Sequence, residues 1–293
     1  NETRIFYGKA ACMSFHEFAV DSDGVNLYCK RYLPNSGKAL SQRPPLLLIH
    51  GGCIDCDFYD AAGPLLANLF DAVTFDRRGF GRSEHPSNGD YSVAIQTCDA
   101  LAVANAAFGD APAFVFAHSA GGSVGISFST AHPNRVRQLM LFESPVLDCV
   151  DPASPLMADI VQMKKNIEAG QEAGSFGGGF LFGLGPKDSR APKPTREQRA
   201  RASSNVRTSI VCEADIFFGF KPNYEALSKI PVVVAAAELN RGYPLEGLSK
   251  AVAERLGCPL VHYPGAHNSP SDLPVDFACM TAGVFLMEGK GLL

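Results

Sequence analysis

Residues 113–122 read Ala-Phe-Val-Phe-Ala-His-Ser-Ala-Gly-Gly and decide the fold class of this 293-residue chain. The apolar run at its start is typical of a strand buried on both faces, and a helix is expected from Ala120 onward. A sharp turn between strand and helix exposes the hydroxyl of Ser119 if its neighbours are small. Ala117 and Gly121 meet that condition. Ser119 is therefore a candidate nucleophile, and the alternative is an ordinary helix N-cap.

Two glycine-containing turns come before this segment in the chain. An apolar strand ends in His50, Gly51 and Gly52, and glycine lets the backbone approach a ligand closely. The N–H groups of Gly51 or Gly52, together with that of Ala120, would form an oxyanion hole; the alternative is a plain tight turn. The second turn, 76–83, reads Asp-Arg-Arg-Gly-Phe-Gly-Arg-Ser and shapes a loop without carrying chemistry itself.

The remainder of the chain alternates strands with helices. This alternation predicts a mostly parallel sheet with helices on both faces, and an opening hairpin adds antiparallel edge strands. The expected strands are 15–20, 25–32, 45–49, 72–75, 113–117, 136–142, 231–237 and 259–263, and the expected helices are 59–69, 93–108, 120–131, 245–256 and 276–287.

Residues 146–225 break this alternation. About 80 residues between two strands of one sheet is too long for an ordinary connection, which indicates a helical cap over the strand ends. Phe180 and Phe182 are expected to line a substrate pocket, because a protein surface rarely exposes such residues. The alternative is a surface insertion without function. The predicted division is a core of 1–145 and 226–293 and a cap of 146–225, with cap helices at 159–169 and 195–212.

The order and spacing of the three turns resemble those of the α/β-hydrolase superfamily. The resemblance covers residues 15–287 and implies an eight-stranded, mostly parallel sheet with a helical cap inserted after strand 136–142. The loop after the last strand, around His267, resembles the histidine loop of the superfamily, so His267 is the expected base for Ser119. By the same resemblance, His50 and His118 are expected to be pocket walls.

The acid that supports the histidine departs from the usual pattern. Most of the superfamily carries an Asp after the next-to-last strand, where this chain has Asn240, and an amide cannot stabilise an imidazolium as a carboxylate does. Glu143, after strand 136–142, stands at a second location used by a subgroup that includes fungal lactonases acting on zearalenone. We expect Glu143 to be the acid, with Glu238 as the rival. The cap tryptophan of those lactonases has no counterpart, because the chain contains no Trp.

The expected reaction is hydrolysis of a carboxylic ester or lactone through an acyl-enzyme. The phenylalanines of the cap favour an apolar, polyketide-like or aromatic small-molecule substrate. One alternative keeps the triad but transfers the acyl group to a hydroxyl, as in a thioesterase-like macrolactone cyclase or acyltransferase. A second alternative is a non-catalytic binding protein on the same fold. No metal and no organic cofactor is expected for any of these readings.

Composition narrows the expected partners. The net charge is −4 with acids and bases mixed along the chain, which gives no basic stripe for nucleic acid. No apolar run approaches the ~18 residues of a membrane span, and the start has no signal-peptide pattern. Nine cysteines, including a lone C-x-x-C at Cys53 and Cys56, are read as packed thiols of a cytoplasmic protein. A homodimer is left open.

Overall fold

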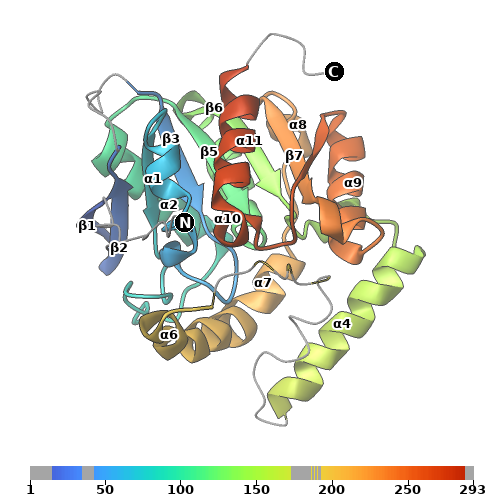
Figure 1. The fold of residues 1–293 in the computed structure, drawn as a ribbon. Helices are drawn as coiled ribbons and strands as arrows, with labels where there is room; N and C mark the ends of the chain where they lie inside the picture. Colours follow the sequence, from blue (N-terminus) through green and yellow to red (C-terminus); the bar gives the residue numbers. More distant parts are fainter. Residues whose placement is uncertain are drawn as a thin grey trace, which may run out of the picture.

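The protein is described by a computed structural model that covers residues 15–34, 43–172, 186, 188, 190 and 193–287, with the side chains of 163 and 166–172 excepted (Figure 1). Its centre is an eight-stranded sheet of order β1-β2-β4-β3-β5-β6-β7-β8. β2 pairs antiparallel with both β1 and β4, and the other pairs are parallel. The α/β-hydrolase fold and the mostly parallel sheet expected from the sequence are therefore confirmed.

The strands lie close to their predicted bounds. They are β1 (Phe15–Ser22), β2 (Val25–Tyr32), β3 (Pro45–Ile49), β4 (Asp71–Phe75), β5 (Ala113–His118), β6 (Val136–Phe142), β7 (Val232–Ala237) and β8 (Leu260–Tyr263). The helices are α1 (Gly63–Leu66), α2 (Val93–Phe108), α3 (Gly121–Ala131), α4 (Pro155–Glu172), α6 (Arg196–Arg207), α7 (Ala214–Phe218), α8 (Tyr224–Leu227), α9 (Pro244–Leu256), α10 (Ser269–Asp272) and α11 (Pro274–Leu286).

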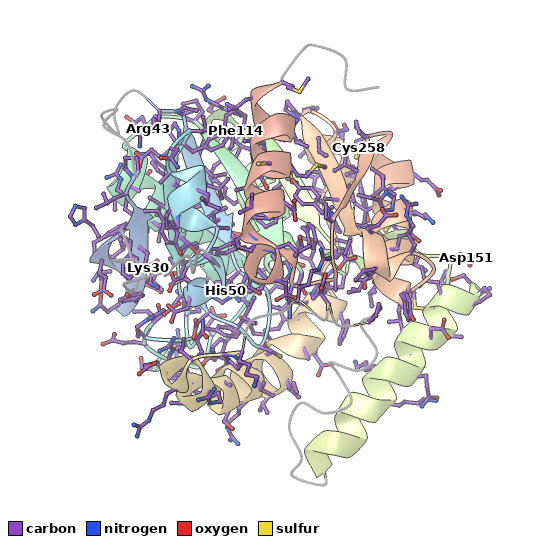
Figure 2. The ribbon with its side chains drawn as sticks, viewed as in Figure 1. Lys30, Arg43, His50, Phe114, Asp151 and Cys258 are labelled. Atoms are coloured by element: carbon purple, nitrogen blue, oxygen red, sulfur yellow. The ribbon has the colours of Figure 1, made fainter. Side chains whose placement is uncertain are left out.

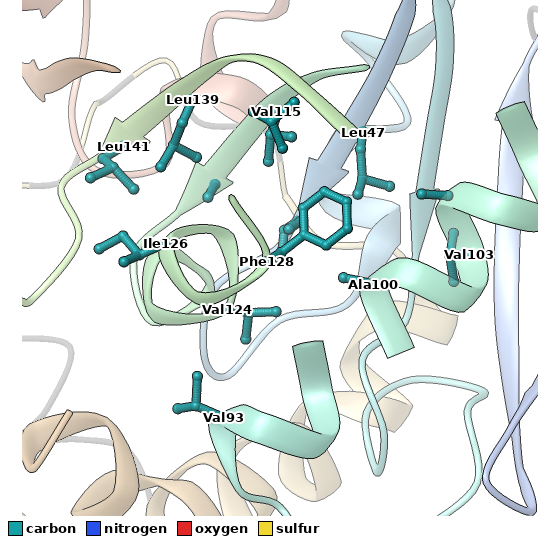
Figure 3. Packing of buried hydrophobic residues seen from close by; sticks show 14 of the residues in the cluster. Leu47, Val93, Ala100, Val103, Val115, Val124, Ile126, Phe128, Leu139 and Leu141 are labelled. Carbon is teal, nitrogen blue, oxygen red and sulfur yellow. The ribbon is translucent and has the colours of Figure 1, made fainter. Parts of the chain in front are cut away.

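Successive side chains of the central strands point to opposite faces of the sheet, and each face has its own apolar cluster. Val115 of β5 and Leu139 of β6 belong to the cluster that packs against α2 and α3 (Figure 3). Phe116 and Met140, the next residue along each strand, belong to the cluster on the other face, which includes residues of α1 and α11. Strands buried on both faces are continuous apolar runs, which is why the sequence predicted them well.

The helix expected at 59–69 is not one helix. The structure has a short 3-10 turn, Cys56–Tyr59, followed by the four-residue helix α1. Pro64 lies at the start of α1, and because proline has no N–H it cannot continue a helix from the preceding turn. The correction shortens this helix but leaves the order of the strands unchanged.

The described residues between β6 and β7 include α4, then α6 and α7 joined by a π-helix, and then the short α8. α4 packs through Leu156 and Ile160 against Leu245 and Leu248 of α9, and Figure 1 shows it extending away from the sheet. α6 continues directly into a π-helix, Thr208–Glu213, where the sequence predicted one α-helix to residue 212. Figure 1 shows α6 and α7 at one end of the sheet. The prediction that residues 146–225 form a cap domain separate from the core stays a prediction.

Phe180 and Phe182 lie outside the described residues, so their predicted place in a substrate pocket stays a prediction. Among the helices of the described residues, none combines the length and the apolarity needed to cross a membrane.

Candidate active site

Ser119 occupies a strained turn between β5 and α3. Its φ is 51°, in the left-handed region that non-glycine residues rarely adopt, and its N–H donates to the carbonyl of Phe142 at 2.8 Å. A side chain on Gly121 would collide with the carbonyl oxygen of His50. The turn therefore requires small neighbours, as the sequence suggested, and it presents the Ser119 side chain at the carboxyl end of the sheet.

Ala117 stands where many members of the superfamily carry a glycine, and the structure shows what accommodates it. Gly125 of α3 faces Ala117, and a Cβ on Gly125 would lie 2.6 Å from the Ala117 Cβ. In this chain the glycine that permits the close contact between β5 and α3 therefore lies on the helix, and the strand carries Ala117.

The imidazole of His267 donates from Nδ1 to Oε2 of Glu143, at 2.6 Å. Glu143 follows β6, has φ 46° and is fully buried, whereas His267 is 14% exposed. Two further groups donate to the same carboxylate: the Ala237 N–H to Oε1 and the Asn240 amide to both oxygens, each at 2.8 Å. A proton held on Nδ1 leaves Nε2 of the imidazole to accept one.

Glu238, the rival acid, lies elsewhere. Its carboxylate pairs with Arg241 at 2.7 Å and is half exposed, and this hydrogen bond holds the pKa of Glu238 below its usual value. Asn240, at the usual position of the acid, donates its amide to Glu143 instead. The structure therefore brings His267 together with Glu143 and not with Glu238.

His118 connects the histidine loop to the serine turn. Its Nε2–H donates to the carbonyl of His267 at 2.9 Å, and the two rings lie 4.5 Å apart between centroids. Burial, then the neighbouring His267, lowers the pKa of His118 well below its usual value, so the ring is neutral. Between residues that the structure describes, no hydrogen bond joins Ser119 to His267. Such bonds are commonly long before substrate binds.

The candidate oxyanion hole lies beside Ser119. A Cβ on Gly51 would be 2.8 Å from the Ser119 Cβ, and one on Gly52 would be 3.8 Å from the Cβ of Ala120. Within the described part of the chain, the N–H groups of Gly52 and Ala120 have no hydrogen-bond partner. These two donors are therefore available to a carbonyl oxygen that approaches Ser119.

The buried ring of His50 forms hydrogen bonds with two backbone groups of the protein. It is fully buried at the carboxyl end of β3 (Figure 2), where its Nε2 accepts from the N–H of Arg77 at 3.0 Å. Its Nδ1 then carries the proton and donates to the Gly51 carbonyl at 2.7 Å. Burial and the Arg77 charge lower the pKa of His50 well below its usual value. The predicted contact of His50 and His118 with substrate stays a prediction.

Sequence reasoning missed the residues around Arg77. Its guanidinium donates to the backbone of the turn after β3 and pairs with Glu213, and both side chains are 1% exposed. Gln96 of α2 completes the cluster by accepting from Arg77 and donating to Glu213. The available signal was a single acid, Glu213, within the otherwise apolar stretch 210–214.

Comparison with known proteins agrees with this architecture. The family model of the alpha/beta hydrolase fold matches residues 44–250, and the chain belongs to that family. Two curated relatives are the uncharacterized hydrolase YraK of Bacillus subtilis, 35% identical over 105 residues (36% of this chain, 38% of the relative), and the 2-hydroxymuconate semialdehyde hydrolase of Pseudomonas putida, 34% identical over 106 residues (34% and 36%). The chain thus spans less than two fifths of the length of these relatives.

A solved structure shows the same fold over the whole core. It is that of a serine hydrolase involved in carbazole degradation, with a TM-score of 0.66 and 18% identity over 94% of this chain and 100% of that one. At this identity the likeness concerns the fold alone, because one fold supports many different chemistries.

Proposed function

We propose that the protein is a serine hydrolase of a carboxylic ester or lactone. The observation that carries the proposal is the bond between His267 and the buried carboxylate of Glu143, beside the strained turn that presents Ser119. A serine hydroxyl needs a base to become a nucleophile, and an imidazole needs a carboxylate to hold its tautomer and stabilise its charge. Both of the relatives described above are named as hydrolases, which supports hydrolysis as the class of reaction.

In the proposed reaction, His267 removes the proton of Ser119 as the hydroxyl attacks the carbonyl carbon. The N–H groups of Gly52 and Ala120 stabilise the negative oxygen of the tetrahedral intermediate. His267 then protonates the leaving alcohol, and water, activated by the same imidazole, releases the acid from the acyl-enzyme. Glu143 remains ionised throughout and stabilises the imidazolium.

We propose an apolar or aromatic substrate on the strength of the aromatic residues between β6 and β7. Among the described residues of this segment, Phe217 is buried, and its ring centroid lies 5.5 Å from Cζ of Arg77, which donates to the turn that carries the Gly52 N–H. Turnover of p-nitrophenyl octanoate should therefore show a higher kcat/KM than that of the acetate. Equal values would argue against an apolar acyl pocket.

Kinetics of Ser119→Ala test the proposal. The purified protein should hydrolyse p-nitrophenyl butyrate, and Ser119→Ala should lose activity by several orders of magnitude. Ser127→Ala, on the outer part of α3, is the matched control and should retain full activity. More than about a tenth of the wild-type kcat in Ser119→Ala would overturn the assignment. Heavy-oxygen label from water in the product acid distinguishes hydrolysis from acyl transfer to a hydroxyl.

A further inference from the structure

The orientation of the Gly51–Gly52 peptide is fixed from its carbonyl side. Its oxygen accepts from His50 Nδ1 at 2.7 Å and from an Arg77 terminal nitrogen at 3.1 Å. In a trans peptide the carbonyl and the N–H point in opposite directions. The two donors therefore direct the Gly52 N–H away from Arg77. This N–H is one of the two candidate oxyanion donors, so its direction depends on where Arg77 is held.

Arg77 is held by a residue from the segment between β6 and β7. Glu213 accepts from both terminal nitrogens of Arg77, at 2.7 and 3.1 Å. Burial raises the pKa of Glu213, and the Arg77 charge opposes that rise. A buried guanidinium without a partner is strongly unfavourable, so loss of Glu213 would force Arg77 to move or to recruit water.

The next peptide, Gly52–Cys53, is bonded directly to a residue of the same segment. Ser209 accepts through Oγ from the N–H of Cys53 at 2.6 Å, and a Cβ on Gly52 would lie 2.8 Å from this oxygen. Cys53 has φ 61°, a conformation that a non-glycine residue keeps only when its surroundings impose it. Ser209 therefore stabilises the strained conformation of Cys53, which ends the turn that carries the Gly52 N–H.

Both residues belong to the π-helix Thr208–Glu213. π-Helical turns are rare and occur frequently at functional sites, because the extra residue re-aims side chains within a helix. At its first residue, the Thr208 hydroxyl donates to the Gly79 carbonyl at 2.9 Å. The π-helix thus bonds to the loop after β4 through Thr208 and to the Gly52–Cys53 peptide through Ser209, and Glu213 binds Arg77, which donates to the Gly51–Gly52 peptide.

We propose that the π-helix Thr208–Glu213 sets the geometry of the oxyanion hole, with Glu213 and Ser209 as positioning residues. Glu213 acts through Arg77 on the Gly51–Gly52 peptide, and Ser209 acts on the N–H of Cys53. Displacement of this helix would misalign the Gly52 N–H and so reduce stabilisation of the transition state. The inference rests on the proposed serine hydrolase function.

Kinetics of Glu213→Gln and Ser209→Ala test the inference. Loss of a whole oxyanion donor costs ~10²–10³ in kcat, so misalignment should lower kcat by about tenfold in each variant. KM for p-nitrophenyl butyrate should stay within about twofold, because ground-state binding does not use the hole. The inhibition constant of phenylboronic acid, which forms a tetrahedral adduct with the serine, should weaken in parallel with kcat.

Glu197→Gln and Ser203→Ala are the matched controls, since both side chains are exposed on α6. They should leave kcat and boronate inhibition unchanged. If Glu213→Gln does not fold, Ser209→Ala carries the test, because it removes one oxygen atom only. The inference is overturned if Ser209→Ala and a folded Glu213→Gln keep kcat within twofold, or if kcat/KM falls through KM alone.

Failure of the inference can be told apart from failure of the proposed function. If Ser119→Ala is inactive but Glu213→Gln and Ser209→Ala are fully active, the proposed role of the π-helix is refuted and the proposed serine hydrolase function is not. An active Ser119→Ala would remove the proposed function itself.

Discussion

At the scale of single residues, Glu143 and Asn240 stand at the two positions where the superfamily places the acid, and they are bonded to each other. Glu143 contacts the imidazole, and Asn240, at the usual position of the acid, donates to both oxygens of that carboxylate. The sequence could suggest Glu143, because it follows a clear apolar strand at a second location that a subgroup of the superfamily uses for the acid. It could not reveal the donor role of Asn240, which depends on two loops meeting at adjacent strand ends.

Glu143→Gln should lower kcat by about 10³–10⁴, because an amide keeps the shape of the side chain but does not stabilise the imidazolium. The melting temperature should fall as well, because an amide nitrogen in place of either carboxylate oxygen would face groups that themselves donate hydrogen bonds. Steady-state kinetics on an ester, with thermal unfolding beside them, check both expectations. Glu238→Gln is the control and should keep nearly full activity. A large loss in Glu238→Gln with little effect of Glu143→Gln would reverse the assignment of the acid.

The cluster of Arg77, Gln96 and Glu213 could not be predicted from the sequence. Arg77 and Glu213 are 136 positions apart, and their pairing requires the π-helix to dock on the turn after β3. No periodicity in the sequence encodes that docking. By contrast, Ser119 and His267 each follow a strand, and the local pattern together with the resemblance to the superfamily was enough to single them out as candidates.

At the scale of elements, the contact between β5 and α3 determines how the serine turn is built. Ala117 on the strand and Gly125 on the helix form a complementary pair, in which one small residue makes room for the other. The strand and the helix were both predicted from their patterns. The reason that Ala117 is tolerated was not, because it lies in the packing of one element on another.

Gly125→Ala should reduce the free energy of unfolding by about 1–3 kcal/mol, since the added methyl group overpacks the interface with Ala117. Ala117→Gly in the same chain should recover most of that loss by returning the space. Urea unfolding of Gly125→Ala and of the double variant with Ala117→Gly measures the effect. Gly283→Ala is the control, because it adds a methyl group to α11 where no other atom lies nearby. Independent, additive effects of the two substitutions would contradict the proposed pairing.

At the scale of the whole molecule, charged groups join parts of the chain that the sheet does not connect. Asp57 pairs with Lys30 of β2, with Arg82 after β4 and with Arg201 of α6. The sequence predicted the sheet, its edge hairpin and the helices α2, α3, α9 and α11, because these follow from apolar periodicity. Ion pairs of this kind follow from the final fold and had no signal in the sequence.

Asp57→Asn should make the protein less stable at neutral pH and less sensitive to acid. Burial would raise the pKa of Asp57, but hydrogen bonds from Arg82 and Lys30 prevail and lower it to about 2. The stabilisation, roughly 1–2 kcal/mol, is therefore present above the unfolded pKa near 4 and is lost as the pH falls through about 2. Urea unfolding between pH 7 and pH 2 should show the two proteins converging; a constant difference would refute this.

The central claim is that Ser119 is the nucleophile, and covalent labelling tests it most directly. Diethyl p-nitrophenyl phosphate should release one p-nitrophenolate per chain and inactivate the protein. Peptide mass spectrometry should then place the diethylphosphoryl group on Ser119, and Ser119→Ala should remain unlabelled. A label on another residue, or undiminished ester hydrolysis by a protein labelled at Ser119, would contradict the account.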